Sequence, residues 1–288
     1  MRAARRLARQ PAAVAALVLL AVVFAAGALA PELAPQGWNA IDLAPQWANH
    51  GPTLSGWHVL GTDNIGRDVL VRTLYGLHNT VLVVFIGAAL ATLVGVVLGS
   101  IAAFYGGWLD AGLMRAGDLV TAFPAMVLML AVFAFIPNVT PFDATLVFAA
   151  YMAMFAARMV RARLVALSAE EFVQAARALG ASDVRILGRH LLPNATGTVL
   201  AAGTALIGQI ALLEATVEFI GFGVSSQVHP TLGNLIADAT SSGIGSYNSL
   251  GLGWWVWAGP AIVLVLILVC ANLAGDGLDA ALSPRAAR

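Results

Sequence analysis

The sequence contains no lysine and little charge of either sign. All 15 basic residues are arginine, and charged residues make up 10% of the 288-residue chain, whereas soluble domains carry roughly 25%. Hydrophobic residues make up 60%, and the mean hydropathy is +0.85. This composition excludes a soluble globular enzyme, a disordered protein and a coiled coil, and it predicts an integral membrane protein that crosses the bilayer several times.

Other scarcities exclude particular chemistries. A phosphate-binding loop of the Walker type needs a lysine, so no ATPase of that type is expected in this chain. The single cysteine, Cys270, excludes a disulfide framework and a thiolate metal cluster. A formal net charge of zero gives no reason to expect nucleic-acid binding. No metal site is expected, because the five histidines lack metal-ligand spacing: His50, His58, His78, His190 and His229.

Long gaps between charged residues predict about six transmembrane helices, each long enough to cross roughly 30 Å of hydrocarbon. The third of these spans is interrupted early by Pro124, and the fourth lies in the shortest stretch without charged residues, between Asp143 and Arg158. The expected spans are Pro11–Ala30, Thr80–Ala103, Leu119–Ile136, Phe142–Met159, Leu200–Leu213 with flanks from Thr196, and Trp254–Ala274. In the second of these, small residues recur at four-residue spacing and predict close helix packing: Gly87, Ala91, Gly95 and Gly99.

The first span also resembles a secretory signal peptide, because arginines precede it and Ala28-Leu29-Ala30 resembles a cleavage site. Its length and the following Pro31 favour an uncleaved anchor. With the N-terminus in the cytoplasm, 13 of the 15 arginines fall on the inner side, which predicts that both termini are cytoplasmic. The expected organisation is an anchor at 1–30, an outer loop at 31–79, a five-span core at 80–276 with an inner loop at 160–194, and a tail at 277–288.

The inner loop carries a helix–turn–helix pattern over residues 168–193. Ser168 and Glu171 form a predicted capping box at the start of the first helix. Gly180 is expected to end that helix in the left-handed conformation, and Pro193 to close the second helix. An ordinary amphipathic connector at the membrane surface is the alternative interpretation.

The same loop resembles a signature of the membrane subunits of bacterial ABC importers: Glu-Ala-Ala, three residues, Gly, nine residues, then an aliphatic residue, any residue, Leu and Pro. Here Gln174-Ala175-Ala176 precedes Gly180, and His190-Leu191-Leu192-Pro193 follows at the matching distance. Gln174 replaces the acidic residue and His190 the aliphatic one. The sequences of residues 175–182 (AARALGAS) and 189–194 (RHLLPN) are most similar to those of the C-type permeases of dipeptide, oligopeptide and nickel importers.

Two further stretches support this subgroup. Residues 60–81 resemble the family segment GTD-x-x-GRD before the second span, and residues 214–235 resemble its Glu-Ala…Gly-x-Gly…Gly-Asn stretch after the fifth. The sequence departs from the family at Val71, His78, Glu218 and Leu232.

The resemblance implies an all-α permease of the type I ABC importer fold in the bacterial cytoplasmic membrane. It further implies transport of di- and oligopeptides together with a homologous permease, ATPase subunits and an extracytoplasmic solute-binding protein. The chain would hold no catalytic residue and no cofactor, since ATP and Mg belong to the partner ATPases. Contact with the ATPases is expected through Glu171, Gln174, Ala175, Ala176, Arg177, Gly180, His190 and Pro193.

Two other polar groups have competing interpretations. An outer segment that contains Gly61, Thr62, Asp63, Gly66, Arg67, Asp68 and Arg72 is expected to form an amphipathic helix on the outer membrane surface, with docking to the solute-binding protein as the alternative. Glu214 and Glu218 lie four residues apart, on one helix face. They form either a site for a cation or a peptide amine, or a pair exposed to water near the interface.

Three alternative functions remain open from the sequence. The same machinery could import nickel or another small solute. A stand-alone secondary transporter would need intramembrane carboxylates, for which Asp143 and Glu214 are the weak candidates. An intramembrane hydrolase would use Ser225 or Ser226, but no histidine is placed on a later span to activate either hydroxyl.

Overall fold

The computed structural model describes residues 7–41, 50–53, 58–241 and 253–282. Within these ranges the elements are helical apart from two isolated β-bridges. The helices are α2 (Pro11–Ala28), α3 (Ala30–Leu33), α4 (Val69–Val81), α5 (Gly87–Tyr105), α6 (Gly107–Ala122), α7 (Ala125–Ala134), α8 (Pro141–Ser168), α9 (Glu171–Ala178), α10 (Asp183–Ile186), α11 (Leu192–Phe219), α12 (Leu232–Ser241) and α14 (Trp254–Leu282), with π-helical turns at Leu82–Ile86 and Leu187–Leu191. The predicted all-α architecture is confirmed.

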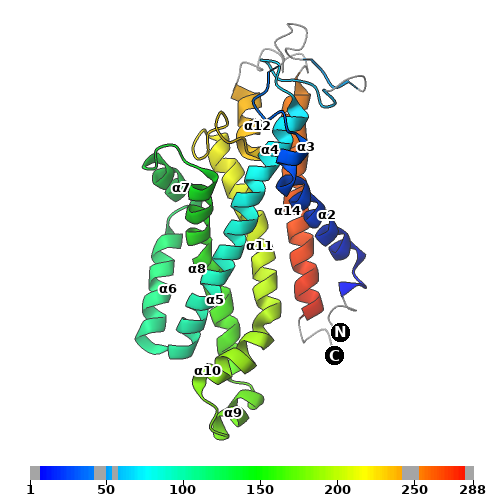
Figure 1. Cartoon of the computed structure of the whole chain (residues 1–288). Coiled ribbons are helices and arrows are strands. Elements are labelled where there is room, and N and C mark those ends of the chain that lie inside the picture. Colours follow the sequence, from blue (N-terminus) through cyan, green and yellow to red (C-terminus); the bar gives the residue numbers. More distant parts are fainter. Residues whose placement is uncertain (1–6, 42–49, 54–57, 242–252, 283–288) are drawn as a thin grey trace.

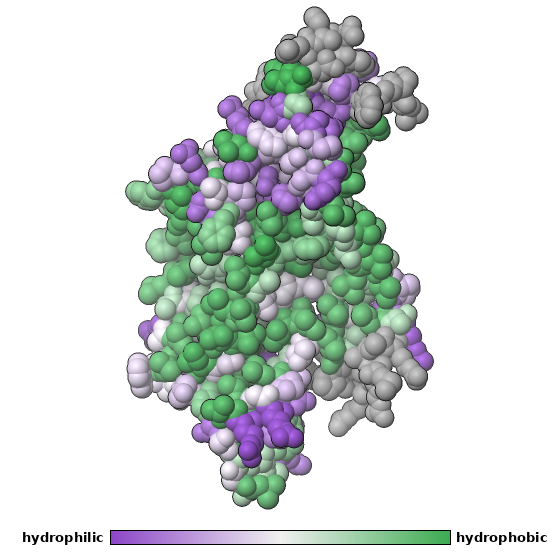
Figure 2. Space-filling model, viewed as in Figure 1, coloured by the Kyte–Doolittle hydropathy of each residue, from purple (hydrophilic) through white to green (hydrophobic). Residues whose placement is uncertain are grey.

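Five helical segments are long and apolar enough to cross a membrane: Pro11–Ala28, Val69–Tyr105, Pro141–Ser168, Asp183–Phe219 and Trp254–Leu282. A sixth crossing is available if α6 and α7, bent by 84° at their junction, count as one broken span. Figure 2 shows the resulting apolar belt between two hydrophilic ends. Four of these five segments extend beyond the predicted spans because charged residues at their ends are included in the helix, whereas Pro11–Ala28 ends two residues before the predicted Ala30.

The third expected span, Leu119–Ile136, is interrupted at Pro124 as predicted, but its bounds are wrong. Phe123 is extended because the residue before a proline avoids the helical region, and the chain turns sharply at Pro124. In place of the expected helix, α6 begins at Gly107 and carries Asp110 and Asp118 along its length. A search by charge gaps misses α6, because these carboxylates are paired with arginines of the neighbouring helix α8.

Small residues bring α5 and α8 into close contact, as predicted for Gly95 and Gly99. A Cβ atom added at Gly95 would lie 2.4 Å from the Cβ of Ala156, and one at Gly99 would lie 2.6 Å from the carbonyl oxygen of Ala157. Neither neighbour is the movable end of a long side chain. These glycines therefore set the distance between the two helices.

Helix α2 packs against both α4 and α14. A Cβ atom at Gly27 would lie 2.9 Å from Val81 of α4, and one at Gly277 would lie 2.1 Å from the Cβ of Ala13. The start of α2 and the end of α14 lie toward the same end of the bundle as α9 and α10 (Figure 1). The arginines of both tails that supported the orientation, Arg2, Arg5, Arg6, Arg285 and Arg288, lie outside the described residues.

Candidate functional site

The inner loop folds as a helix, a glycine turn and a second helix. Gly180 follows α9 with a φ of +76°, the left-handed conformation predicted for it. The Gly180 N–H donates to the carbonyl of Arg177 at 2.9 Å, and the Ala181 N–H donates to the carbonyl of Ala176 at 3.0 Å. These two bonds satisfy carbonyls that the helix end leaves open. The turn is thus closed by the chain's own backbone.

Both predicted ends of this loop are wrong in detail. Ser168 is the last residue of α8, and its hydroxyl donates to the carbonyl of Val165. The N-cap position of α9 is Glu170, and no side chain caps the helix. Pro193 lies in the first turn of α11, which continues from α10 through the π-helical turn Leu187–Leu191. A wider turn is a common way to accommodate a proline that lacks its N–H. The second helix therefore runs into the span without a stop.

The loop has an anchored side and an exposed side. Val173 and Ile186 are buried in a cluster with Leu164 and Leu167 at the end of α8. Sequence reasoning missed Val173, although its apolar character within a polar segment was a signal. On the other side, Phe172, Leu179 and Val184 are 41%, 88% and 80% exposed.

The predicted loop residues are distributed over this surface. Gln174 donates from its amide to the carbonyl of Ala169 at 3.1 Å, which fastens α9 to the end of α8. Ala176 and His190 are partly buried. The remaining members are exposed: Glu171, Ala175, Arg177, Gly180 and Pro193. The structure therefore places most of the expected set on the outside of a rigid, internally bonded loop.

The expected surface helix over Asp63 to Arg72 is wrong. Asp63 accepts hydrogen bonds from the backbone N–H groups of Ile65 and Arg67, at 3.0 and 2.9 Å, so this segment is a turn. Asp68 caps α4 by accepting from the Val71 N–H at 2.8 Å. Such local bonds compete with a helix, which is why α4 starts only at Val69 and continues directly into the second span.

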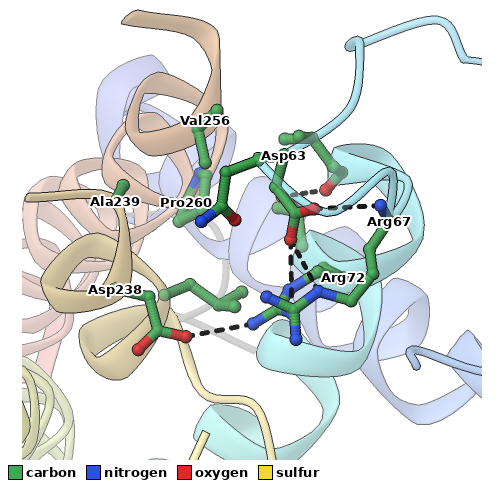
Figure 3. A pocket seen from close by; sticks show the side chains of 11 residues that line it. Asp63, Arg67, Arg72, Asp238, Ala239, Val256 and Pro260 are labelled. Carbon is green, nitrogen blue, oxygen red and sulfur yellow. Dashed lines mark hydrogen bonds and ion pairs between the residues drawn. The ribbon is translucent and has the colours of Figure 1, made fainter. Parts of the chain in front are cut away.

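Arg72 joins this turn to α12, as Figure 3 shows. Its side chain is 5% exposed; Nη1 lies 3.5 Å from Asp63, and Nη2 donates to Asp238 at 3.2 Å. Asp63 also pairs with Arg67 at 2.6 Å. Asp238 in turn accepts from the Ser226 hydroxyl at 3.1 Å, and burial raises its pKa above the ordinary value, although Ser226 and Arg67 oppose the shift. These ion pairs tie the outer turn, α4 and α12 together.

Glu214 and Glu218 are 1% and 4% exposed, so the expectation that water reaches them near the interface is wrong. The hydroxyl of Thr231 donates to Glu218. A Cβ atom added at Gly233 would lie 2.6 Å from the Cα of Ala215. The pair therefore lies where α12 packs closely on α11. An Oε1 atom of each glutamate has no hydrogen-bond partner among the described residues.

The four residues that depart from the family pattern take part in packing or hydrogen bonds within the bundle. Val71 and Leu232 are buried apolar residues, and the imidazole Nδ1 of His78 is 2.8 Å from the carbonyl oxygen of Gly27, which connects α4 with α2. Glu218 accepts from Thr231. Each departure thus belongs to the packing of the outer half of the bundle.

No cluster of three or more histidine, cysteine, aspartate or glutamate residues that could hold a metal ion occurs within the described ranges. In those same ranges, the hydroxyl of Ser226 is hydrogen-bonded to a carboxylate and has no imidazole partner. The Ser225 backbone carbonyl accepts from the N–H of His229. This arrangement is that of a structural turn, not of an activated nucleophile.

Comparisons with known proteins agree with this architecture. Residues 95–288 match the family described as the binding-protein-dependent transport system inner membrane component. Residues 1–52 match the N-terminal transmembrane domain of oligopeptide transport permease C. The chain is 34% identical over 285 residues to the oligopeptide transport system permease protein OppC of Mycobacterium tuberculosis and of Mycobacterium bovis, which covers 97% of this chain and 92% of each relative. It is also 34% identical over 283 residues to a protein of Brucella suis that is named as a peptide transport system permease, covering 98% and 90% of the two chains.

Proposed function

Because the chain belongs to the family of inner membrane components of binding-protein-dependent transport systems, we propose that it forms half of an ATP-driven import path for di- and oligopeptides. The chain is a multi-pass inner membrane protein and a permease subunit of the ABC peptide transporters. The other half of the path is a homologous permease, and an extracytoplasmic solute-binding protein delivers the peptide.

The exposed apolar tip of the inner loop carries this proposal. Leu179 and Val184 are 88% and 80% exposed on a segment that extends beyond the apolar belt, with hydrophilic residues between the two (Figure 2). A patch of exposed apolar side chains that lies outside the membrane and is bordered by polar residues marks a protein contact surface. The partner we propose for this surface is the ATPase subunit, which binds ATP and Mg.

The connections of the loop suit transmission of a movement. On one side α8 runs unbroken from Pro141 to Ser168, and on the other the helical segment from Asp183 continues to Phe219. Because Val173 and Ile186 fix the loop to the end of α8, a displacement of its tip moves both spans as one rigid unit. ATP then drives transport because the inward and outward states of the permease bind the ATPases differently.

A secondary transporter is less well supported. Asp143, one of its two candidate carboxylates, accepts from the N–H and hydroxyl of Thr140 at 3.0 and 2.7 Å and completes the cap of α8. The other, Glu214, is enclosed beneath α12. Asp143 thus has a structural task, and Glu214 lies in the packed contact between α11 and α12. Import of nickel or another small solute by the same machinery would change the binding protein and leave the proposed coupling intact.

Purification from the native membrane in mild detergent tests the proposal. We expect an ATPase subunit, a second permease and a binding protein to be recovered with the chain. The variant Leu179→Asp should lose the ATPase, whereas Phe135→Asp, an equally exposed apolar residue (87%) between α7 and α8, should keep it. Recovery without any ATPase, or equal recovery with both variants, would contradict the proposed role of the loop.

A further inference from the structure

An open groove lies between the bend that joins α6 to α7 and the helices α8 and α11. Its volume is about 660 Å³, within the usual range of ligand pockets. Apolar side chains dominate its wall, but four polar ones also line it: Thr121, Tyr151, Arg158 and Gln209. Tyr151 and Gln209 belong to the membrane-spanning segments of α8 and α11.

Three of these four side chains have polar atoms without a hydrogen-bond partner in the described part of the protein. Among the described residues, neither the Tyr151 hydroxyl nor the Gln209 amide has a hydrogen-bond partner. The buried Nε of Arg158 also lacks one. In contact with lipid tails such groups would cost several kcal/mol each. Water or a polar ligand in the groove removes that cost.

A second groove on α11 provides an internal comparison. It lies between α5 and α11, has a volume of about 410 Å³, and is lined by Ile207, Thr92 and Thr204 among others. Here the Thr92 hydroxyl donates to the carbonyl of Ala88 at 2.7 Å, and Thr204 donates to that of Leu200 at 3.0 Å. Its polar groups are satisfied within their own helices. This groove suits a lipid chain or an apolar helix.

We propose that the groove between α6/α7, α8 and α11 is the wall that this subunit contributes to the peptide path. Gln209 and Tyr151 hydrogen-bond the backbone of an extended peptide, and Arg158 receives its C-terminal carboxylate. This inference rests on the proposed function. An amide side chain both donates and accepts, so Gln209 engages any peptide backbone irrespective of sequence.

The ion pair between Arg158 and Asp118 is open enough for a peptide carboxylate to replace Asp118. Its Nη1 is 3.3 Å from the Asp118 carboxylate and its Nη2 donates to the Thr121 hydroxyl at 2.7 Å. The two charged side chains are 39% and 63% exposed, so the ion pair is not enclosed. By contrast, Arg161, one turn further along α8, is bound to both oxygens of Asp110. Arg158 is thus the less tightly bound cation of the two.

Cysteine accessibility in the complete transporter tests this inference. Gln209→Cys and Ile207→Cys lie two residues apart on α11, one in each groove. In membrane vesicles, we expect a charged, membrane-impermeant thiol reagent to modify Gln209→Cys and to leave Ile207→Cys unmodified. Saturating peptide with ATP should slow the labelling of Gln209→Cys several-fold. The native Cys270 is buried and gives the background rate.

Each other outcome overturns the inference. No labelling of Gln209→Cys, or of Leu212→Cys in the same groove, would mean that lipid or a partner helix fills it. Equal labelling of both grooves, or labelling insensitive to peptide, would mean that it is no part of the path. Peptide uptake by the unmodified transporter is measured first. If that uptake is absent, the proposed function itself fails; if it is present, only the groove assignment is at stake.

The carboxylate role has its own readout. Arg158→Gln should slow uptake of peptides with a free C-terminus roughly tenfold, the effect of losing one charge-assisted hydrogen bond, with little effect on C-terminally amidated peptides. A purely structural role would slow both peptides alike and would overturn this part of the inference.

Discussion

Replacement of Gly180 by leucine tests the link between the inner loop and transport. A Cβ atom at this position meets nothing within 4 Å, so the substitution causes no collision. The destabilisation of the loop comes only from the backbone, because a residue with a side chain loses roughly 1–2 kcal/mol in the left-handed conformation that Gly180 adopts at φ = +76°. If the turn opens instead, the hydrogen bonds of Gly180 and Ala181 to α9 are lost, at about 1 kcal/mol each. Either route reduces the population of the native loop by about 5- to 30-fold.

The assay is peptide-dependent ATP hydrolysis and uptake by the complete transporter in proteoliposomes. Gly188→Leu is the matched control, because Gly188 is in the same loop, has equally open surroundings and lacks a positive φ. Asparagine tolerates the left-handed region, so Gly180→Asn should retain more activity than Gly180→Leu. All variants should reach the membrane in equal amounts. Full coupled uptake by Gly180→Leu, or equal losses for Gly180→Leu and Gly188→Leu, would refute the reasoning.

Three further predictions concern the stability of the bundle. Gly95→Ala should lower the unfolding temperature in detergent, because its methyl group would lie 2.4 Å from the Cβ of Ala156 and overpacking costs about 1–3 kcal/mol. Gly112 has open space around it, so Gly112→Ala should be neutral. Equal effects of the two variants would contradict the close contact between α5 and α8. Arg72→Met should destabilise the outer turn by about 3 kcal/mol, because it leaves buried Asp63 without one of its cations. Limited proteolysis of the outer loop measures this loss of stability, and an unchanged cleavage rate would contradict the prediction. Since burial raises the pKa of Asp238, its protonated form is favoured in the folded state, so stability should fall as pH rises above about 4. Asp238→Asn should remove that part of the pH dependence of the unfolding temperature, and an unchanged profile would contradict the assignment.

Local chemistry explains which parts of the site could be predicted. The Gly180 turn depends on a glycine after a short amphipathic helix, and the structure reproduces it. The expected helix over Asp63 and Arg67 is wrong because a pattern of charges on one face cannot reveal that Asp63 bonds to its own backbone. Amphipathic spacing alone does not distinguish a helix from such a turn.

Tertiary pairing explains the remaining differences. Gaps between charges do not reveal α6, because its Asp110 and Asp118 pair with Arg161 and Arg158 of α8, 51 and 40 residues away. The groove depends equally on distant contacts. Nothing near Gln209 in the sequence indicates that its amide lacks a partner in the folded bundle.

Peptide transport driven by ATP is the central claim, and reconstituted uptake tests it most directly. The complete transporter of the source organism, with and without this chain, would be placed in proteoliposomes together with its binding protein and a labelled oligopeptide. We predict uptake that requires both this chain and ATP hydrolysis and that persists when ion gradients are collapsed. Uptake by this chain alone, driven by a proton or sodium gradient, would contradict the account.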